Sequence, residues 1–340
     1  MRHFTVTDVH DPRWSAILNS CINFDFYHTQ CYHILETGTK AVLLTAHFGD
    51  HLIAFPFLIR QIPNSDYFDC TSAYGYCGPV GSQDLANFSN DEIAFFWAET
   101  FSFFVSSKII AAFSRLHPLI PHASLFDQAG QVKDINQTVS IDLRITEEEQ
   151  KKQYRKSNKS ELNQLRRKGY IVEEASDNHD IDEFIKIYHE TMRRVNASEN
   201  YFFTSAYFYK FLRNSCFKSK LLLAKKDGKV AAGAIFTITK SIMQYHLAAT
   251  TEEFIKDTPM KLVLDTARLE GNALHLDFLH LGGGVGGNDN DSLFKFKSGF
   301  SDYRNQFQIW QAVIDQEVYD DLCSQANADQ NSSFFPLYRS

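Results

Sequence analysis

Two periods of apolar and polar residues run along this chain, one typical of strands and one of helices. Short apolar runs bounded by turn residues predict strands at 41–46, 52–60, 108–113, 138–143, 170–174, 221–226, 229–239, 242–249, 276–281 and 307–313. Apolar residues at three- and four-residue spacing predict helices from about residue 11, and at 91–107, 146–168, 180–194, 204–214, 258–269 and 316–324. A similar order of elements lies on both sides of Leu143. This order predicts an α/β (α+β mixed) fold with two mixed sheets.

Local signals mark where several of these elements begin and end. Thr146 and Glu149 form a capping-box pattern, and Gly169 is typical of a helix end. The pair Asp227-Gly228 predicts a hairpin turn between two strands. At 340 residues the chain exceeds one ordinary core, so we expect two domains, 1–145 completed by 302–340, and 146–301.

The stretch 276–300 carries the strongest candidate chemistry. Its apolar run breaks into five glycines, namely Gly282, Gly283, Gly284, Gly286 and Gly287. A basic segment with Lys295 and Lys297 follows. Glycines let the backbone approach another group closely, and lysines supply positive charge. The combination predicts a site for an anionic group.

A nucleotide-binding fold is a tempting interpretation of the same glycines, because they satisfy G-x-G-x-x-G. Such a turn should open a strand–helix–strand unit, but only 53 residues follow Gly287 and they lack that order. A phosphate-binding loop of the Walker type would need Lys and Ser or Thr where Asn288 and Asp289 stand. We therefore disfavour a nucleotide cofactor.

Two further stretches have two interpretations each. Residues 151–168 hold eight Lys or Arg against the single acid Glu161, and Arg155, Lys159 and Arg166 are predicted to share a helix face. The segment either binds a phosphorylated substrate or is a solvated helix face. The loop Tyr74-Gly75-Tyr76 either contacts a sugar or peptide or is a packed turn.

Composition excludes several classes of protein. The chain is 44% apolar and 22% charged, as in globular proteins, and its net charge of −7 argues against a DNA-binding protein. The most apolar stretch, 93–113, contains Glu99 and Lys108, so no membrane span is predicted. Six cysteines without a C-x-x-C pair are interpreted as reduced thiols of a cytoplasmic protein. His47 and His51 flank a predicted hairpin turn, and no metal site is expected.

Several motifs occur in an order that resembles the Fem family, the peptidoglycan-bridge aminoacyltransferases, and related GNAT-like N-acyltransferases. They are YGYCGP, YRKSNKSELNQLRRKG, YHETMRRVNASENYFF, GKVAAGAIF with QYHLAAT, TPMKLVLDTA, and LHLGGG with SLFKFKSGFS. The resemblance covers about residues 70–314.

The resemblance implies two tandem GNAT-like domains, of the acyl-CoA N-acyltransferase type, packed around a cleft. It implies direct attack of an amine on an activated acyl group, without a covalent enzyme intermediate or a permanently bound cofactor. The donor would be an acyl-CoA or an aminoacyl-tRNA, contacted at its acceptor end. The acceptor would be an amine on a nucleotide-linked or lipid-linked sugar or peptide of the cell envelope or a surface glycan.

The family's site residues are carried over position by position. Lys297, in Phe296-Lys297-Ser298-Gly299-Phe300, matches the F-K-x-G-F lysine and would steady negative charge on the acyl carbonyl or on a phosphate. The expected substrate-binding residues are Tyr74, Tyr76, Arg155, Lys159, Arg193, Tyr201, Gly283, Gly284 and Lys295. A lysine at the surface without a role is the alternative for Lys297.

The chain also departs from its relatives. The long coiled-coil arm of some Fem proteins is absent, since no heptads interrupt 146–300. The Gln/Arg-x-x-Gly-x-Gly/Ala loop of acetyl-CoA enzymes is replaced by IKDTPMKL, without glycine. The donor therefore stays open, and a non-catalytic GNAT-like scaffold for an envelope precursor or a protein partner is the second hypothesis.

Overall fold

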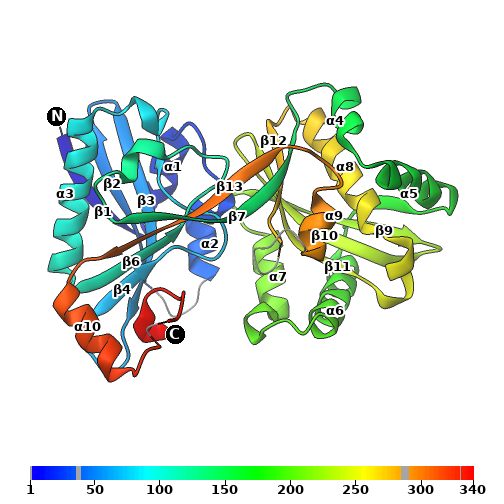
Figure 1. Ribbon diagram of the computed structural model, residues 1–340. Helices are drawn as coiled ribbons and strands as arrows, with labels where there is room; N and C mark the ends of the chain where they lie inside the picture. The colour runs from blue at the N-terminus through cyan, green and yellow to red at the C-terminus, as the bar shows by residue number, and fades with distance from the viewer. Residues whose placement is uncertain (1, 36–39, 285–290, 330) are drawn as a thin grey trace. The chain divides into compact units, whose positions relative to one another are not determined.

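The computed structural model describes residues 2–35, 40–284, 291–329 and 331–340. Unit 1 comprises Met1–Ile135 and Gln306–Ser340, and unit 2 comprises Asn136–Asn305. The chain passes between the units in β7 (Gln131–Asp142) and β13 (Arg304–Val313), each of which has residues in both (Figure 1). We describe each unit by itself.

In unit 1 the strand order is β1-β2-β3-β4-β6-β13, with β5 paired to β3. Its strands are β1 (Arg2–Asp8), β2 (Lys40–Phe48), β3 (His51–Gln61), β4 (Phe68–Thr71), β5 (Val80–Gly81), β6 (Ile109–Arg115) and part of β13. Its helices are α1 (Arg13–Ser20), α2 (Gln30–Leu35), α3 (Asn90–Ser106) and α10 (Gln316–Gln325). β4 and β6 run parallel, while the other neighbours are antiparallel. Apolar side chains of α3 pack on β2 and β3 to form the core.

In unit 2 the strand order is β7-β12-β11-β10-β9-β8. The strands after β7 are β8 (Ile171–Glu174), β9 (Lys218–Lys226), β10 (Lys229–Thr239), β11 (Ile242–Thr250) and β12 (Phe278–Gly282). The helices are α4 (Glu147–Gln153), α5 (Lys156–Arg167), α6 (Asn178–Arg194), α7 (Ser205–Leu212), α8 (Met260–Ala273) and α9 (Ser292–Lys297). Among the described residues of this unit, β11 and β12 pair in parallel, while the other neighbouring strands pair antiparallel.

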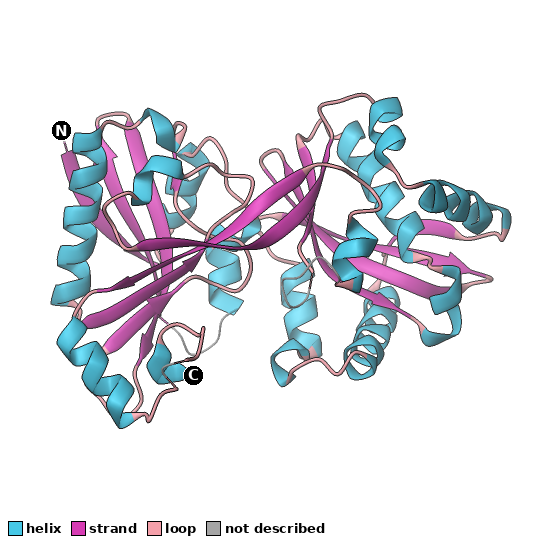
Figure 2. Ribbon diagram, viewed as in Figure 1, coloured by secondary structure: helices cyan, strands magenta, loops and turns pink. Residues whose placement is uncertain are grey.

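Successive side chains of β10 point to opposite faces of the unit 2 sheet, and each face is covered by different helices. Ala232 and Ala234 belong to the core that α8 and α5 complete, whereas Gly233 faces Phe184 of α6. Figure 1 shows α8 on one face and α6 and α7 on the other, and Figure 2 shows strands between helices in both units. The predicted α/β (α+β mixed) class is confirmed, but the prediction of two separate sheets is wrong, because the described strands are assigned to one mixed sheet of 13 strands.

The structure corrects several local predictions. α3 is capped by Ser89 in a capping box with Glu92, and Asn90 is already helical. The predicted helix 146–168 is two helices, because Tyr154 and Arg155 have extended backbone between α4 and α5. α8 continues to Ala273, and the edge strand β1 lies in a stretch for which no strand was predicted.

Two expectations from composition have mixed outcomes. Cys21, Cys70, Cys77 and Cys323 are buried free thiols, whereas Cys31 and Cys216 are disulfide-bonded, so the prediction of six reduced thiols is wrong for those two. Within the described part of the chain, no helix combines the length and apolar character needed to cross a membrane.

Candidate functional site

In unit 2 the parallel strands β11 and β12 separate after a short paired stretch. They pair from Ile242↔Phe278 to Gln244↔His280. Directly beyond, His246 is an extra residue in β11 opposite β10, and Leu281 is an extra residue in β12 opposite β7. Such bulges bend a strand and interrupt its pairing, and they are common beside active sites. A hydrogen bond of 2.6 Å between His280 Nδ1 and Gln244 Oε1 marks the last pair.

The amine of Lys297 lies close to the residues that follow this last pair. Its Nζ donates a hydrogen bond of 2.6 Å to the carbonyl of Gly283, just after β12. It also lies 5.7 Å from the ring centre of Tyr245 in β11. The side chain is 7% exposed, so the surface-lysine alternative is wrong. Burial lowers the pKa of Lys297 to about 7, against the attraction of Asp291.

The segment that carries Lys297 is helical. Asp291 caps α9 by accepting a hydrogen bond of 2.7 Å from the backbone of Phe294. In a helix, residues two apart do not share a face. Lys295 is accordingly exposed while Lys297 is buried. The two predicted cations therefore do not converge on one point.

The described glycines shape the backbone before α9. Gly282 has a φ of +75°, which favours glycine, and a Cβ on Gly284 would lie 2.2 Å from Asp291 Oδ1. Gly283 turns its carbonyl, rather than its N–H, toward Lys297. Gly286 and Gly287 lie outside the described residues. Binding of substrate by Gly283 and Gly284 stays a prediction.

The junction between α4 and α5 packs on the residues that follow Lys297. The backbone N–H of Arg155 and Nδ2 of Asn158 donate to the carbonyl of Gly299, at 2.9 and 2.8 Å. Arg155 Nη1 donates to the carbonyl of Lys295 at 2.9 Å. These bonds fix the C-terminal end of α9. They also explain why Arg155 does not share a helix face with Lys159 and Arg166, since Arg155 stands at the junction.

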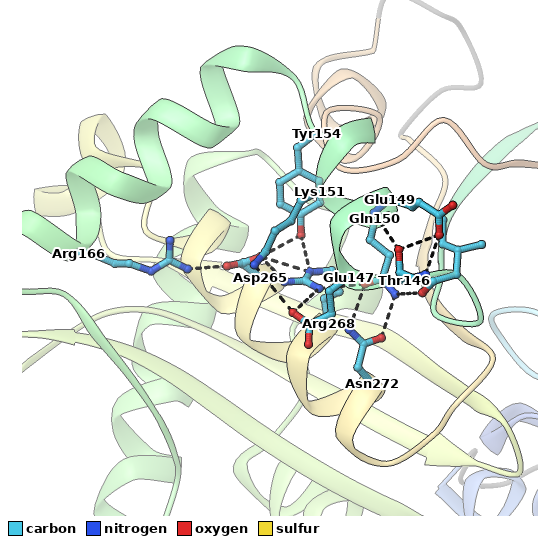
Figure 3. A network of polar contacts seen from close by, with 11 residues as sticks. Thr146, Glu147, Glu149, Gln150, Lys151, Tyr154, Arg166, Asp265, Arg268 and Asn272 are labelled. Carbon is cyan, nitrogen blue, oxygen red and sulfur yellow. Dashed lines mark hydrogen bonds and ion pairs between the residues drawn. The ribbon is translucent and has the colours of Figure 1, made fainter.

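A buried polar network holds the same two helices on α8 (Figure 3). Arg268 is 0% exposed and donates to Gln150 of α4 at 2.9 Å and to Tyr154 at 3.1 Å. Its guanidinium pairs with Asp265 at 3.2 Å, and Asp265 also accepts from Arg166 of α5 at 2.6 Å. The network therefore links α4 and α5 to α8.

The N-terminus of α8 carries a carboxylate from α5. Glu161 accepts a hydrogen bond of 3.0 Å from Thr258 Oγ1 and another from Lys261 Nζ. Burial raises the pKa of Glu161, but these hydrogen bonds outweigh it and lower the pKa overall, so the group is ionised at neutral pH. The backbone N–H groups of Thr258, Lys261 and Leu262 already donate to backbone carbonyls. These three N–H groups are therefore already engaged within the protein, whereas phosphate binding at a helix N-terminus uses open ones.

The predicted tyrosines of unit 1 lie in a packed loop after β4. Tyr74 is 47% exposed, with the Arg115 guanidinium 5.7 Å from its ring centre, whereas Tyr76 packs against Phe307 at 5.2 Å. A Cβ on Gly75 would lie 2.0 Å from the Tyr27 ring, so this position requires glycine. The loop is therefore a packed turn with one exposed ring.

The remaining predicted residues lie elsewhere in unit 2. Arg193 is exposed in the last turn of α6, and Tyr201 lies in the short helical turn Glu199–Tyr201. Lys159 is exposed and donates to the carbonyl of Lys152 at 3.2 Å. Within the predicted set, hydrogen bonds join Lys297 with Gly283, and Lys295 with Arg155.

Sequence reasoning missed several polar residues of the site. Gln244 and His280 stand inside apolar strands, which is the pattern that could have marked them. The pair of Glu161 with Lys261 spans 100 positions and leaves no local signal.

Comparison with known proteins identifies the fold. No protein-family model matches the sequence, and no curated protein matches it either. Among solved structures, FemX is 14% identical with a TM-score of 0.74, covering 93% of this chain and 99% of that one. L-PGS from Bacillus licheniformis is 12% identical with a TM-score of 0.59, covering 89% and 92%. A tandem GNAT protein from the clavulanic acid biosynthesis pathway is 11% identical with a TM-score of 0.50, covering 92% and 99%. The chain has the tandem GNAT-like fold of these proteins.

Proposed function

We propose that this chain is a Fem-like N-acyltransferase that moves an aminoacyl group from a tRNA to an amine of a cell-envelope precursor. The observation that carries the proposal is the buried Lys297 amine beside the diverging strands β11 and β12. A water-poor position strengthens hydrogen bonds to charge that develops in a reaction. The likeness to FemX over nearly the whole chain supports the same class of reaction.

The proposed reaction is direct aminolysis of an ester. The amine nitrogen of the acceptor attacks the carbonyl carbon, a C–N bond forms, and the C–O bond to the ribose breaks. Negative charge develops on the carbonyl oxygen in between. Lys297 Nζ, held by Gly283, is the donor that we assign to this oxygen.

The choice of tRNA over acyl-CoA rests on the N-terminus of α8. A pyrophosphate there would meet the ionised carboxylate of Glu161, which already holds Thr258 and Lys261. Like charges at close range disfavour binding, and the N–H groups of Thr258, Lys261 and Leu262 already donate to backbone carbonyls. The exposed cations Arg155 and Lys159 offer a phosphate backbone a different contact.

The acceptor class is proposed from two sources. The names FemX and lysylphosphatidylglycerol synthetase, carried by proteins of similar fold, favour an envelope component. Tyr74 presents an exposed ring with Arg115 above it, an arrangement that suits a sugar or an anionic group. A nucleotide-linked or lipid-linked sugar or peptide with a free amine fits both.

Mass spectrometry of acceptor amines tests the proposal. The protein is incubated with amine-bearing nucleotide-linked and lipid-linked precursors and with either aminoacyl-tRNAs or acyl-CoAs. We expect an acylated amine with an aminoacyl-tRNA. Transfer from acyl-CoA alone would refute the donor assignment, and no transfer with either donor would favour the non-catalytic scaffold.

Lys297→Met and Lys295→Met form a matched pair of variants. Loss of one donor to a developing oxyanion typically costs on the order of 100-fold or more in turnover. We expect that loss for Lys297→Met, with a smaller change in acceptor affinity. Lys295 is exposed on another face of α9, so its variant should keep most of its turnover. Equal turnover in the two variants would refute the role of Lys297.

A further inference from the structure

The proposed reaction needs a proton acceptor as well as an oxyanion donor. The acceptor amine first loses its ammonium proton to solvent, because only the neutral amine presents an electron pair for attack. After attack, its nitrogen carries a proton too many and the leaving ribose oxygen needs one. A group near the reacting atoms that first takes and then returns this proton would serve both needs.

The surroundings of Lys297 favour an uncharged amine. Its Nζ donates to a neutral carbonyl, that of Gly283, and lies 5.7 Å from the ring centre of Tyr245. Burial of a lysine among uncharged groups disfavours its charged form, and here this effect outweighs the attraction of Asp291.

The charged groups near α9 are engaged elsewhere. Asp291, whose charge attracts Lys297, caps α9 by accepting a hydrogen bond from the backbone of Phe294. Arg155 donates to the carbonyl of Lys295. The guanidinium of Arg304, from β13, lies 5.8 Å from the Phe294 ring centre. Asp291 and Arg155 therefore each have a hydrogen-bond partner other than Lys297.

A neutral amine at this position has both a hydrogen-bond donor and a free electron pair. One N–H donates to Gly283, while the electron pair on nitrogen remains to accept a proton. Burial places the pKa of Lys297 near 7, so both forms are populated at neutral pH. A base with a pKa near the working pH is the most effective one.

We infer that Lys297 is the general base of the reaction and then its general acid. This inference rests on the proposed acyl transfer. The neutral amine accepts the proton from the attacking nitrogen as the C–N bond forms. The resulting ammonium faces the negative carbonyl oxygen, then gives the proton to the ribose oxygen as the C–O bond breaks. The lysine is neutral again at the end, and atoms and charges balance.

Lys297→Arg separates this role from that of a fixed cation. Arginine keeps a positive charge and hydrogen-bond donors but does not accept a proton near neutral pH. We expect Lys297→Arg to lose turnover as strongly as Lys297→Met, about 100-fold or more. Wild-type turnover should rise with pH and level off above a midpoint near 7. Turnover of the arginine variant within about tenfold of wild type would overturn the inference.

A direct titration of Lys297 tests the inference without an activity assay. It also does not depend on whether an arginine side chain fits at this position. The chain is prepared with carbon-13 lysine, and the Lys297 signal is assigned by its absence from the Lys297→Met spectrum. We expect its chemical shift to titrate near pH 7. Titration near the ordinary lysine value of about 10.4 would overturn the base role, even in an active enzyme. Failure of the proposed function is a different result, namely no transfer by the wild-type protein.

Discussion

Asp265→Asn is a sharp test of the network that holds α4 and α5 on α8. The change keeps the shape of the side chain and an acceptor oxygen but removes its charge. Arg268 then stays fully buried, with Gln150 and Tyr154 as neutral partners. The next carboxylate, Glu147, lies 3.7 Å from Arg268 and is half exposed, so it compensates only in part.

The buried charge of Arg268, left without its partner, sets the expected loss in the free energy of unfolding. Removing one partner of a buried ion pair costs about 3–5 kcal/mol, and the nearby Glu147 favours the lower end. For a unit of 170 residues (136 to 305), about 3 kcal/mol corresponds to a fall in Tm of roughly 6–12 °C. Arg166→Ala is the matched control, because Arg166 is half exposed and leaves Arg268 paired. We expect less than about 1 kcal/mol there.

Two optical probes can show which unit loses stability. All three tryptophans, Trp14, Trp97 and Trp310, belong to unit 1, so their fluorescence follows that unit. Far-ultraviolet circular dichroism follows both units. In urea unfolding, Asp265→Asn should destabilise the transition seen by circular dichroism, and Arg268→Met added to it should restore stability. A loss below about 1 kcal/mol, or no rescue, would refute the reasoning.

Two further predictions concern pH and the glycine turn. Burial lowers the pKa of His28 to about 3 and of His33 to about 4. The folded state therefore keeps both rings neutral, and its free energy of unfolding is highest above about pH 6.5 and decreases as pH falls from there toward 4. His33→Gln should therefore flatten the fall of the unfolding free energy between pH 6 and 4, by up to about 1.4 kcal/mol per pH unit, and an unchanged slope would contradict this. Gly284→Ala should cost about 1 kcal/mol or more and lower turnover, because its Cβ would meet Asp291 at 2.2 Å and disturb the cap of α9. Gly283→Ala, whose nearest contact would be 3.3 Å, is the control, and equal Tm values in the two variants would contradict the packing argument.

Local patterns in the sequence were sufficient for most of the fold. The capping box at Thr146 and Glu149 and the turn at Asp227 and Gly228 both lie where predicted, because the interactions that form them span only a few residues. The single predicted helix 146–168 failed for a non-local reason. Its middle breaks at Arg155, whose backbone N–H bonds to Gly299, 144 positions later (299 minus 155).

The candidate site was predicted less completely than the fold. Lys297 was reached through the F-K-x-G-F resemblance, but its burial depends on Gly283 and Tyr245, which approach it only in the folded sheet. The charge pattern likewise counted Glu161 as the lone acid of a basic helix. Its contacts with Thr258 and Lys261 come from tertiary packing, and they change the expectation for the donor.

The two units use the same strand arrangement in different ways, which bears on where chemistry takes place. In unit 1, β4 and β6 pair in parallel up to Thr71↔Phe113, and the chain bridges back to β6 at Cys77↔Leu116. The intervening turn is packed, since Gly75 lies against the Tyr27 ring. Burial also raises the pKa of the Cys77 thiol, so a nucleophilic role there is disfavoured. In unit 2, bulges at the corresponding level separate β11 from β12, and a buried amine lies beside them. The packed turn in unit 1 and the buried amine in unit 2 make unit 2 the better candidate for the proposed acyl transfer.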